Sequence, residues 1–115
     1  MNAANAPPVL ACAPGAIPAD DRQAHFGLAR DLFHARALER VALPNGYAVR
    51  FPGDALDAVA RFVTNERKCC PFMNFELTFG PESAPLWLRM TGPEGTKDVL
   101  DAELSLTSSC GCGPR

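Results

Sequence analysis

A chain of 115 residues, 47% hydrophobic and 21% charged, has the composition of one globular domain with a modest core. Its formal net charge of −2, without any basic stripe, argues against a nucleic-acid partner. Charged residues interrupt every hydrophobic segment, so the sequence predicts no membrane span.

Residues 1–18 are rich in alanine and proline, and we expect them to form a flexible N-terminal arm. The first residues lack the positively charged region of a secretory signal, which favours a cytoplasmic location. In a reducing compartment, clustered cysteines serve metals or redox chemistry more often than structural disulfides. The chain has five cysteines, an odd number, and we expect Cys12 in the arm to be a spare thiol.

Residues 19–106 are expected to form a single domain that begins with a helix. Apolar residues recur at helical spacing from Ala24 to Phe33, which predicts a helix ending near His34. His25 and His34 both fall in it, too far apart to share one metal-binding face. We therefore expect both at the surface, with His34 the better ligand candidate if the helix end approaches the cysteines.

Two predicted hairpins follow, joined by a second helix. Alternating apolar residues predict strands over 38–43 and 47–51, with Pro44-Asn45-Gly46 as the turn. The same alternation predicts strands over 75–79 and 86–90. The order indicates an α+β fold: a four-stranded, mainly antiparallel sheet with helices packed on one face. The other face, which carries Trp87 and Arg89, is a candidate homodimer surface.

The second helix is expected to run from Asp54 to Lys68 or Cys69, because Pro71 cannot continue it. A third helix is predicted from Thr96 to Leu104. Residues 107–115 then form an expected flexible tail of small and polar residues that contains two cysteines.

Cys69 and Cys70 stand side by side where the second helix must stop. Thiolates are soft ligands that prefer ions such as Hg(II), Cu(I) or Zn(II). The basic neighbours Arg67 and Lys68 would lower the thiol pKa, whereas the negative end of the helix dipole would raise it. The sequence does not decide whether the thiol pKa is raised or lowered. Burial of either cysteine as an inert core residue is the alternative.

Cys110 and Cys112 flank a glycine in the tail, which could fold back toward the Cys69–Cys70 pair. Four sulfur ligands would then be available, with the tail pair accessory to the core pair. We expect a thiophilic ion there, with Hg(II) favoured over Cu(I) and Zn(II). The alternative is that the tail cysteines have no role.

The sequence does not decide whether the protein is an enzyme. If the chain is an enzyme, Cys69 and Cys70 are the expected thiols and Glu66 the acid, for organomercurial cleavage or dithiol–disulfide redox chemistry. Glu76 is a second acid candidate, although a solvated carboxylate is the simpler interpretation of Glu66. A purely structural module with incidental cysteines is the remaining alternative.

The segment Glu66-Arg67-Lys68-Cys69-Cys70-Pro71-Phe72 resembles a Glu-Arg-x-Cys-Cys-Pro-Phe signature of small bacterial proteins associated with heavy-metal, especially mercury, resistance. The similarity extends over roughly residues 20–104. It implies a thiophilic-metal context for Cys69 and Cys70, and it says less about Cys110 and Cys112.

Overall fold

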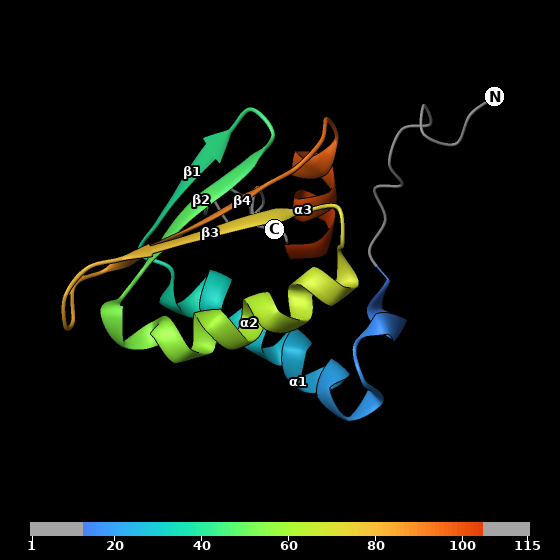
Figure 1. Ribbon diagram of the computed structural model, residues 1–115, viewed down its shortest axis with the longest axis horizontal. Helices are drawn as coiled ribbons and strands as arrows, with labels where there is room; N and C mark the ends of the chain where they lie inside the picture. The colour runs from blue at the N-terminus through green and yellow to red at the C-terminus, as the bar shows by residue number, and fades with distance from the viewer. Residues whose placement is uncertain (1–12, 105–115) are drawn as a thin grey trace.

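The computed structural model describes residues 13–104 (Figure 1). Cys12, Cys110, Cys112 and the predicted tail 107–115 lie outside the described residues. The described helices are α1 (Ala19–Arg30), its π-helical extension η3 (Asp31–Arg36), α2 (Leu56–Cys69) and α3 (Thr96–Leu104), with short 3₁₀ turns η2 (Pro14–Ala16) and η4 (Gly53–Ala55). The strands are β1 (Glu39–Leu43), β2 (Gly46–Phe51), β3 (Asn74–Phe79) and β4 (Leu86–Thr91).

The four strands form one sheet in the order β1-β2-β4-β3, and each neighbouring pair is antiparallel. This confirms the predicted α+β fold. Gly46 opens β2 opposite Thr91, and a Cβ atom there would lie 1.8 Å from the carbonyl oxygen of Met90. Only glycine permits this close approach of the two strands.

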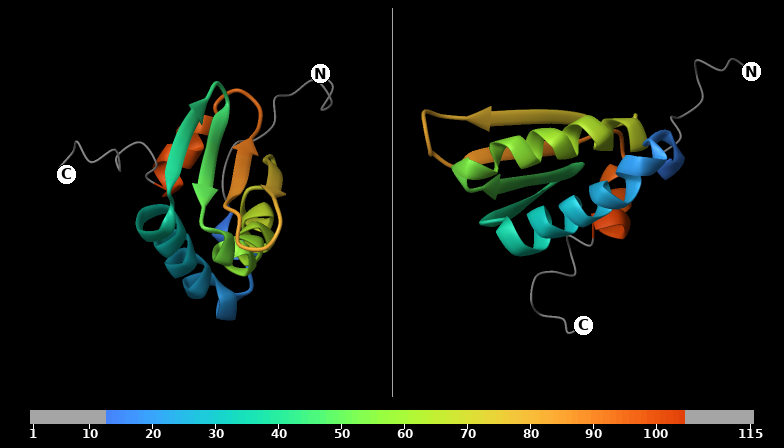
Figure 2. Two further views of the ribbon diagram at one scale, coloured as in Figure 1. Left: turned by 90° about the vertical axis from the view of Figure 1, so that its left-hand side faces the viewer. Right: turned by 90° about the horizontal axis from the view of Figure 1, so that it is seen from below.

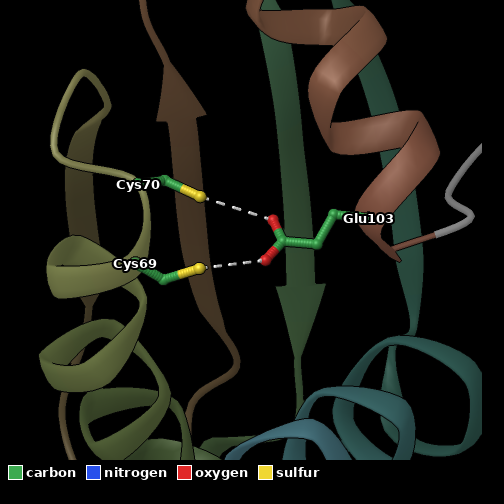
Figure 3. Close-up of side chains that lie close together, drawn as sticks. All are labelled: Cys69, Cys70 and Glu103. Carbon is green, nitrogen blue, oxygen red and sulfur yellow. Dashed lines mark hydrogen bonds between the residues drawn. The ribbon is translucent and has the colours of Figure 1, made fainter. Parts of the chain in front are cut away.

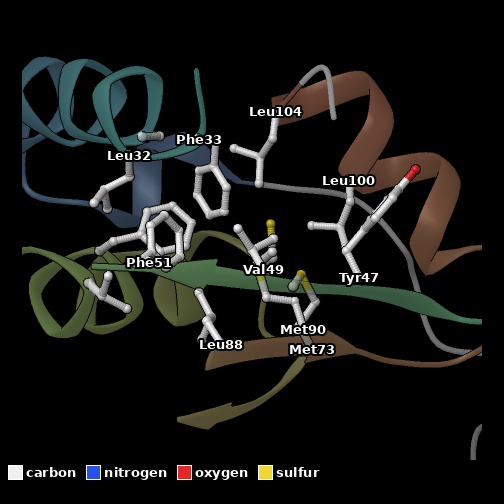
Figure 4. Close-up of a cluster of buried hydrophobic side chains, with 14 of the residues drawn as sticks. Leu32, Phe33, Tyr47, Val49, Phe51, Met73, Leu88, Met90, Leu100 and Leu104 are labelled. Carbon is white, nitrogen blue, oxygen red and sulfur yellow. The ribbon is translucent and has the colours of Figure 1, made fainter. Parts of the chain in front are cut away.

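One face of the sheet carries the helices (Figures 1 and 2). Side chains alternate along each strand, so every second residue of β2 and β4 points toward this layer. Figure 4 shows the resulting core, in which α3 also packs close to β2. The buried side chains of the two central strands are Tyr47, Val49, Phe51, Leu86, Leu88 and Met90.

The opposite face of the sheet is polar and carries exposed ion pairs. Arg50 Nε lies 3.0 Å from Glu39 Oε1, and Arg89 Nε lies 3.1 Å from Glu76 Oε1. The Arg50 guanidinium also stands 6.0 Å from the centre of the Trp87 ring. The predicted homodimer surface stays a prediction.

The buried face of the first helix includes one polar residue that the apolar pattern leaves out, and it excludes Phe26. His25, Ala29, Leu32 and Phe33 are buried, whereas Phe26 is 38% exposed. The buried residues follow the spacing of one helical face, and His25 belongs to it. The expected surface position of His25 is therefore wrong, because its imidazole gains a partner inside the fold.

Helix α2 ends at Cys69, as Pro71 predicts. Its buried residues are Val59, Phe62, Glu66 and Cys69, spaced by three, four and three positions along one face. Glu66 is fully buried, so the interpretation of Glu66 as a solvated carboxylate is wrong.

Packing extends into residues that precede α1. Ile17 is fully buried, and Arg22 Nη2 donates a hydrogen bond to its carbonyl oxygen at 3.1 Å. The core thus includes part of the expected arm of residues 1–18. Among the described helices, none combines the length and apolar character required to span a bilayer.

Candidate metal centre

Two cysteines and one carboxylate meet where α2 ends beside α3 (Figure 3). Cys69 is the last residue of α2, Cys70 caps it, and Glu103 comes from α3. The Cys69 thiol donates to Glu103 Oε2 at 3.6 Å, and Cys70 Sγ lies 3.5 Å from Glu103 Oε1. One ligand atom of each residue lies within 4.8 Å of the others, so this group could hold a metal ion.

The reversal of the backbone after α2 creates this convergence. Cys70 leaves the helix with φ −124° and ψ 77°, away from the α-helical region that a following proline disfavours. Its amide still donates to the Glu66 carbonyl at 2.8 Å, so the turn stays attached to the helix. Both sulfurs can therefore face the same carboxylate, although neighbouring side chains in a regular strand point apart.

Glu66 and His25 form a second layer behind the sulfurs. Glu66 Oε2 lies 3.5 Å from Cys70 Sγ, and Glu66 Oε1 lies 2.8 Å from His25 Nε2. The imidazole stacks on the Phe62 ring at 5.3 Å between centroids. Within residues 13–104, the buried Nδ1 atom of His25 finds no hydrogen-bond partner.

The pKa values of the Glu103 and Glu66 carboxyl groups are both raised. Burial raises the pKa of Glu103 to about 8, with further contributions from a hydrogen bond that Glu103 donates to Glu66 and from the charge of Glu66. Burial also raises the pKa of Glu66, while it lowers the pKa of His25. At neutral pH the cluster therefore holds a proton on Glu103.

The environment of Cys69 opposes its ionisation. Burial and the nearby Glu103 and Glu66 carboxyl groups raise the pKa of the Cys69 thiol to about 12. The side chains of Arg67 and Lys68 are exposed and do not offset this. The sequence does not decide whether the pKa of the thiols is raised or lowered, and in the structure the pKa of Cys69 is raised. Cys69 is therefore a poor nucleophile at neutral pH.

Cys70 differs from its neighbour because it takes part in a disulfide, whereas Cys69 is a free thiol. These two are the only cysteines among residues 13–104. The structure therefore presents the oxidised form of Cys70. Its use as a metal ligand requires reduction of that bond.

A cavity of about 260 Å³ opens beside the acidic groups. Glu66 and Glu103 both line it. Its lining also includes His25, Phe26, Ala29, Arg30, His34 and Leu104. Neither Cys69 nor Cys70 belongs to the described lining of this cavity.

The structure brings together only some of the predicted site residues. Cys69, Cys70 and Glu66 meet, whereas Glu76 lies on the outer face of the sheet with Arg89. His34 is exposed, and its Nε2 atom lies 2.9 Å from the Leu104 carbonyl oxygen. Cys110 and Cys112 fall outside the described residues, so their predicted role stays a prediction.

Two members of the cluster were missed from the sequence, namely Glu103 and His25. Glu103 comes from a helix 34 residues beyond Cys69, and nothing in its local sequence marks it. The position of His25 could have been found from the spacing of Ala29, Leu32 and Phe33 on one face of the helix.

Comparisons with known proteins add no assignment. No protein-family model, no curated protein and no solved structure matches the chain. The cluster of Cys69, Cys70 and Glu103 is therefore the main structural indication of function.

Proposed function

We propose that the reduced protein binds a thiophilic heavy-metal ion at Cys69, Cys70 and Glu103. Hg(II) is the favoured ion, and Cu(I) and Zn(II) are the alternatives. The observation that carries this proposal is the convergence of two sulfurs and one carboxylate oxygen within 4.8 Å. The resemblance of residues 66–72 to a signature associated with mercury resistance supports it.

The spacing of the ligand atoms suits a single ion. Metal–thiolate bonds of about 2.3 Å, as in zinc sites, allow one ion to bridge two sulfurs up to roughly 4.6 Å apart. The span of the described ligand atoms is of this size. A closed structural zinc site has four ligands, whereas this group offers two sulfurs and one oxygen. The smaller set favours an ion that binds strongly through only two thiolates.

The need to remove protons from the ligands also favours a soft ion. The Cys69 thiol has a pKa of about 12 and Glu103 one of about 8, so both are protonated at neutral pH. An ion must displace these protons before it can bind. Only an ion with a strong preference for thiolate sulfur overcomes this competition, and binding should strengthen as the pH rises.

Cys110 and Cys112 would act as accessory ligands that pass the ion to the core pair. This part of the proposal depends on the sequence alone, as does the cytoplasmic location. Deletion of residues 108–115 tests it: we expect slower loading of the core site with unchanged final occupancy. Loading at the full rate in the deletion variant would contradict the hand-over.

Native mass spectrometry of the reduced protein, titrated with Hg(II), Cu(I) and Zn(II), tests metal binding. The titration should use a Cys110→Ser/Cys112→Ser background, so that the tail does not contribute ligands. We expect one Hg(II) per chain, lost in the further Cys69→Ser/Cys70→Ser variant. A matched control is Glu76→Gln, which changes a carboxylate on the outer face. Equal Hg(II) binding by the double cysteine variant would refute the proposed site.

A second candidate function is cleavage of a carbon–mercury bond. It is favoured by one observation, a carboxyl group that holds a proton at neutral pH within 3.6 Å of both sulfurs. Thiolate sulfur would bind the mercury of an organomercurial cation, and the Glu103 proton would pass to the carbon as that bond breaks. The hydrocarbon would leave, and mercury would stay on the two sulfurs.

The release of hydrocarbon distinguishes the two candidates. Gas chromatography of reduced protein mixed with methylmercury should detect methane if the bond is cleaved. We expect the Glu103→Gln variant to bind methylmercury without releasing methane. Stoichiometric binding by the wild-type protein without any methane would leave metal binding as the function.

A further inference from the structure

The cavity of about 260 Å³ is lined by residues of α1, η3, α2 and α3. It is somewhat smaller than the pockets of roughly 300–1,000 Å³ that hold drug-sized ligands. A molecule of amino-acid size therefore suits it better than a nucleotide or a peptide. The chemistry of its lining differs between the exposed part and the buried part.

The exposed part of the lining, which we call the mouth, consists of Phe26, Arg30 and His34. These residues follow one another at intervals of four along the first helix, so they lie on one side of it. Within residues 13–104, the Arg30 side chain forms no ion pair. Its guanidinium can therefore bind a carboxylate through two parallel N–H···O hydrogen bonds.

The inner wall of the cavity carries two carboxyl groups, those of Glu66 and Glu103. Glu66 is fully buried and Glu103 is half-buried. Each carboxyl oxygen can accept more than one hydrogen bond, so contacts with the sulfurs do not exhaust their capacity. This wall suits a ligand group that donates hydrogen bonds, such as an ammonium group, and it disfavours an anionic one.

His25 adds an unsatisfied polar group to the buried lining. Its side chain is 2% exposed, and Nε2 lies 2.8 Å from Glu66 Oε1. The buried Nδ1 atom has no hydrogen-bond partner within the described part of the chain. Buried polar atoms in folded proteins nearly always have a partner, and a ligand in the cavity can supply this one.

We propose that the cavity binds a small α-amino acid in its zwitterionic form. The ligand carboxylate pairs with Arg30 at the mouth, and the ammonium group faces Glu66 and Glu103 on the inner wall. A simple organic acid would leave the acidic wall without a counterpart, and a simple amine would leave Arg30 without one.

The remaining lining sets the type of ligand side chain. Ala29 and Leu104 are buried and apolar, and Phe26 adds an aromatic surface at the mouth. These residues favour a short uncharged side chain, such as that of valine. This binding goes beyond the proposed metal binding and does not require an ion, so either can fail without the other.

An NMR titration of the reduced, metal-free, full-length protein tests the ligand class. The probes are L-valine, isovalerate, which lacks the ammonium group, and isobutylamine, which lacks the carboxylate. We expect saturable binding of valine at neutral pH, at least tenfold tighter than that of either comparator. The largest amide shift changes should fall in residues 25–34 and 103–104. Absence of saturable valine binding, or equal affinity for either comparator, would overturn the proposal.

A pair of arginine variants tests the position of the ligand. Arg30→Met should weaken valine binding at least tenfold. The matched control is Arg61→Met, because Arg61 is also exposed and also lacks an ion pair among residues 13–104. We expect this control to bind valine like the wild type. Unchanged valine affinity in Arg30→Met, or equal weakening in both variants, would overturn the assignment of the carboxylate to Arg30.

Discussion

The two faces of the sheet use glutamates in opposite ways. On the outer face, Glu39 and Glu76 are exposed and paired with arginines at 3.0 and 3.1 Å. On the helix-covered side, Glu66 and Glu103 lie beside sulfurs and a histidine, and burial raises the pKa of both. We call the first pair the outer carboxylates and the second pair the inner carboxyl groups.

This difference distinguishes an ordinary solvent-exposed face from the candidate functional site. The outer carboxylates lie beside arginines, and exposed ion pairs of this kind contribute little to stability. The inner carboxyl groups lie close to two sulfurs, and burial raises the pKa of both. Strongly shifted groups next to a cavity are typical of functional sites. Substitutions of inner and outer glutamates should therefore differ in effect.

The largest difference is expected in stability. Glu66→Ala removes the partner of His25 Nε2 and leaves a buried imidazole without its hydrogen bond. We expect this variant to lose about 2–3 kcal/mol of unfolding free energy, whereas Glu76→Ala should lose less than about 1 kcal/mol. Urea denaturation of the reduced proteins measures both. Equal losses would contradict the contrast between the two faces.

The inner carboxyl groups should also make stability depend on pH. The pKa of Glu103 is about 8 in the folded protein, above the ordinary value of 4.5. Between these values the folded state holds more protons than the unfolded state, so stability falls as the pH rises through 8. His25, whose pKa is lowered, acts in the opposite direction, but only near and below its ordinary value of 6.5.

Glu103→Gln isolates this effect. Above pH 6.5, the variant should lose less stability with rising pH than the wild type, and Glu76→Gln should follow the wild-type curve. Thermal unfolding from pH 6.5 to 8.5 measures the three slopes. A Glu103→Gln curve parallel to the wild type would show that Glu103 does not hold the proton.

Metal affinity should separate the same two substitutions by a smaller amount. Glu103→Gln removes the charged oxygen ligand but leaves both sulfurs, and we expect roughly tenfold weaker Hg(II) binding, about 1.4 kcal/mol. Glu76→Gln should bind like the wild type. Competition titration against a small thiol measures both affinities for reduced protein. An unchanged affinity in Glu103→Gln would limit the site to its two sulfurs.

The smallest effect is expected at the outer ion pairs. Arg89→Ala breaks the contact with Glu76, whose side chain is 66% exposed. The cost should stay below about 1 kcal/mol and shrink as salt is added. Urea denaturation at low and high ionic strength measures it. A larger, salt-independent loss would indicate that the outer face is packed against another surface.

Local sequence signals were sufficient for most of the fold. Pro71 determines the end of α2, and the alternating apolar residues of the strands indicate the antiparallel sheet. The adjacent cysteines also indicate Cys69 and Cys70 as a candidate site. The bounds of α3 were predicted as Thr96 to Leu104, which the structure confirms.

The site could be predicted only in part, because half of it arises from contacts distant in sequence. Glu103 joins the thiols through packing of α3 on the sheet, which no local pattern encodes. The sequence predicts Glu66 as a solvated carboxylate, although its spacing from Phe62 and Cys69 follows the buried face of α2. A glutamate is rarely buried without a partner, and its partner His25 lies 41 residues away.

The most direct test of the metal centre is X-ray absorption spectroscopy at the mercury edge. The sample is the reduced Cys110→Ser/Cys112→Ser protein loaded with one Hg(II) per chain. We predict two sulfur neighbours, reduced to one in the further Cys69→Ser variant and to none when Cys70 is replaced as well. A spectrum with the same sulfur shell in all three proteins would contradict binding at Cys69 and Cys70.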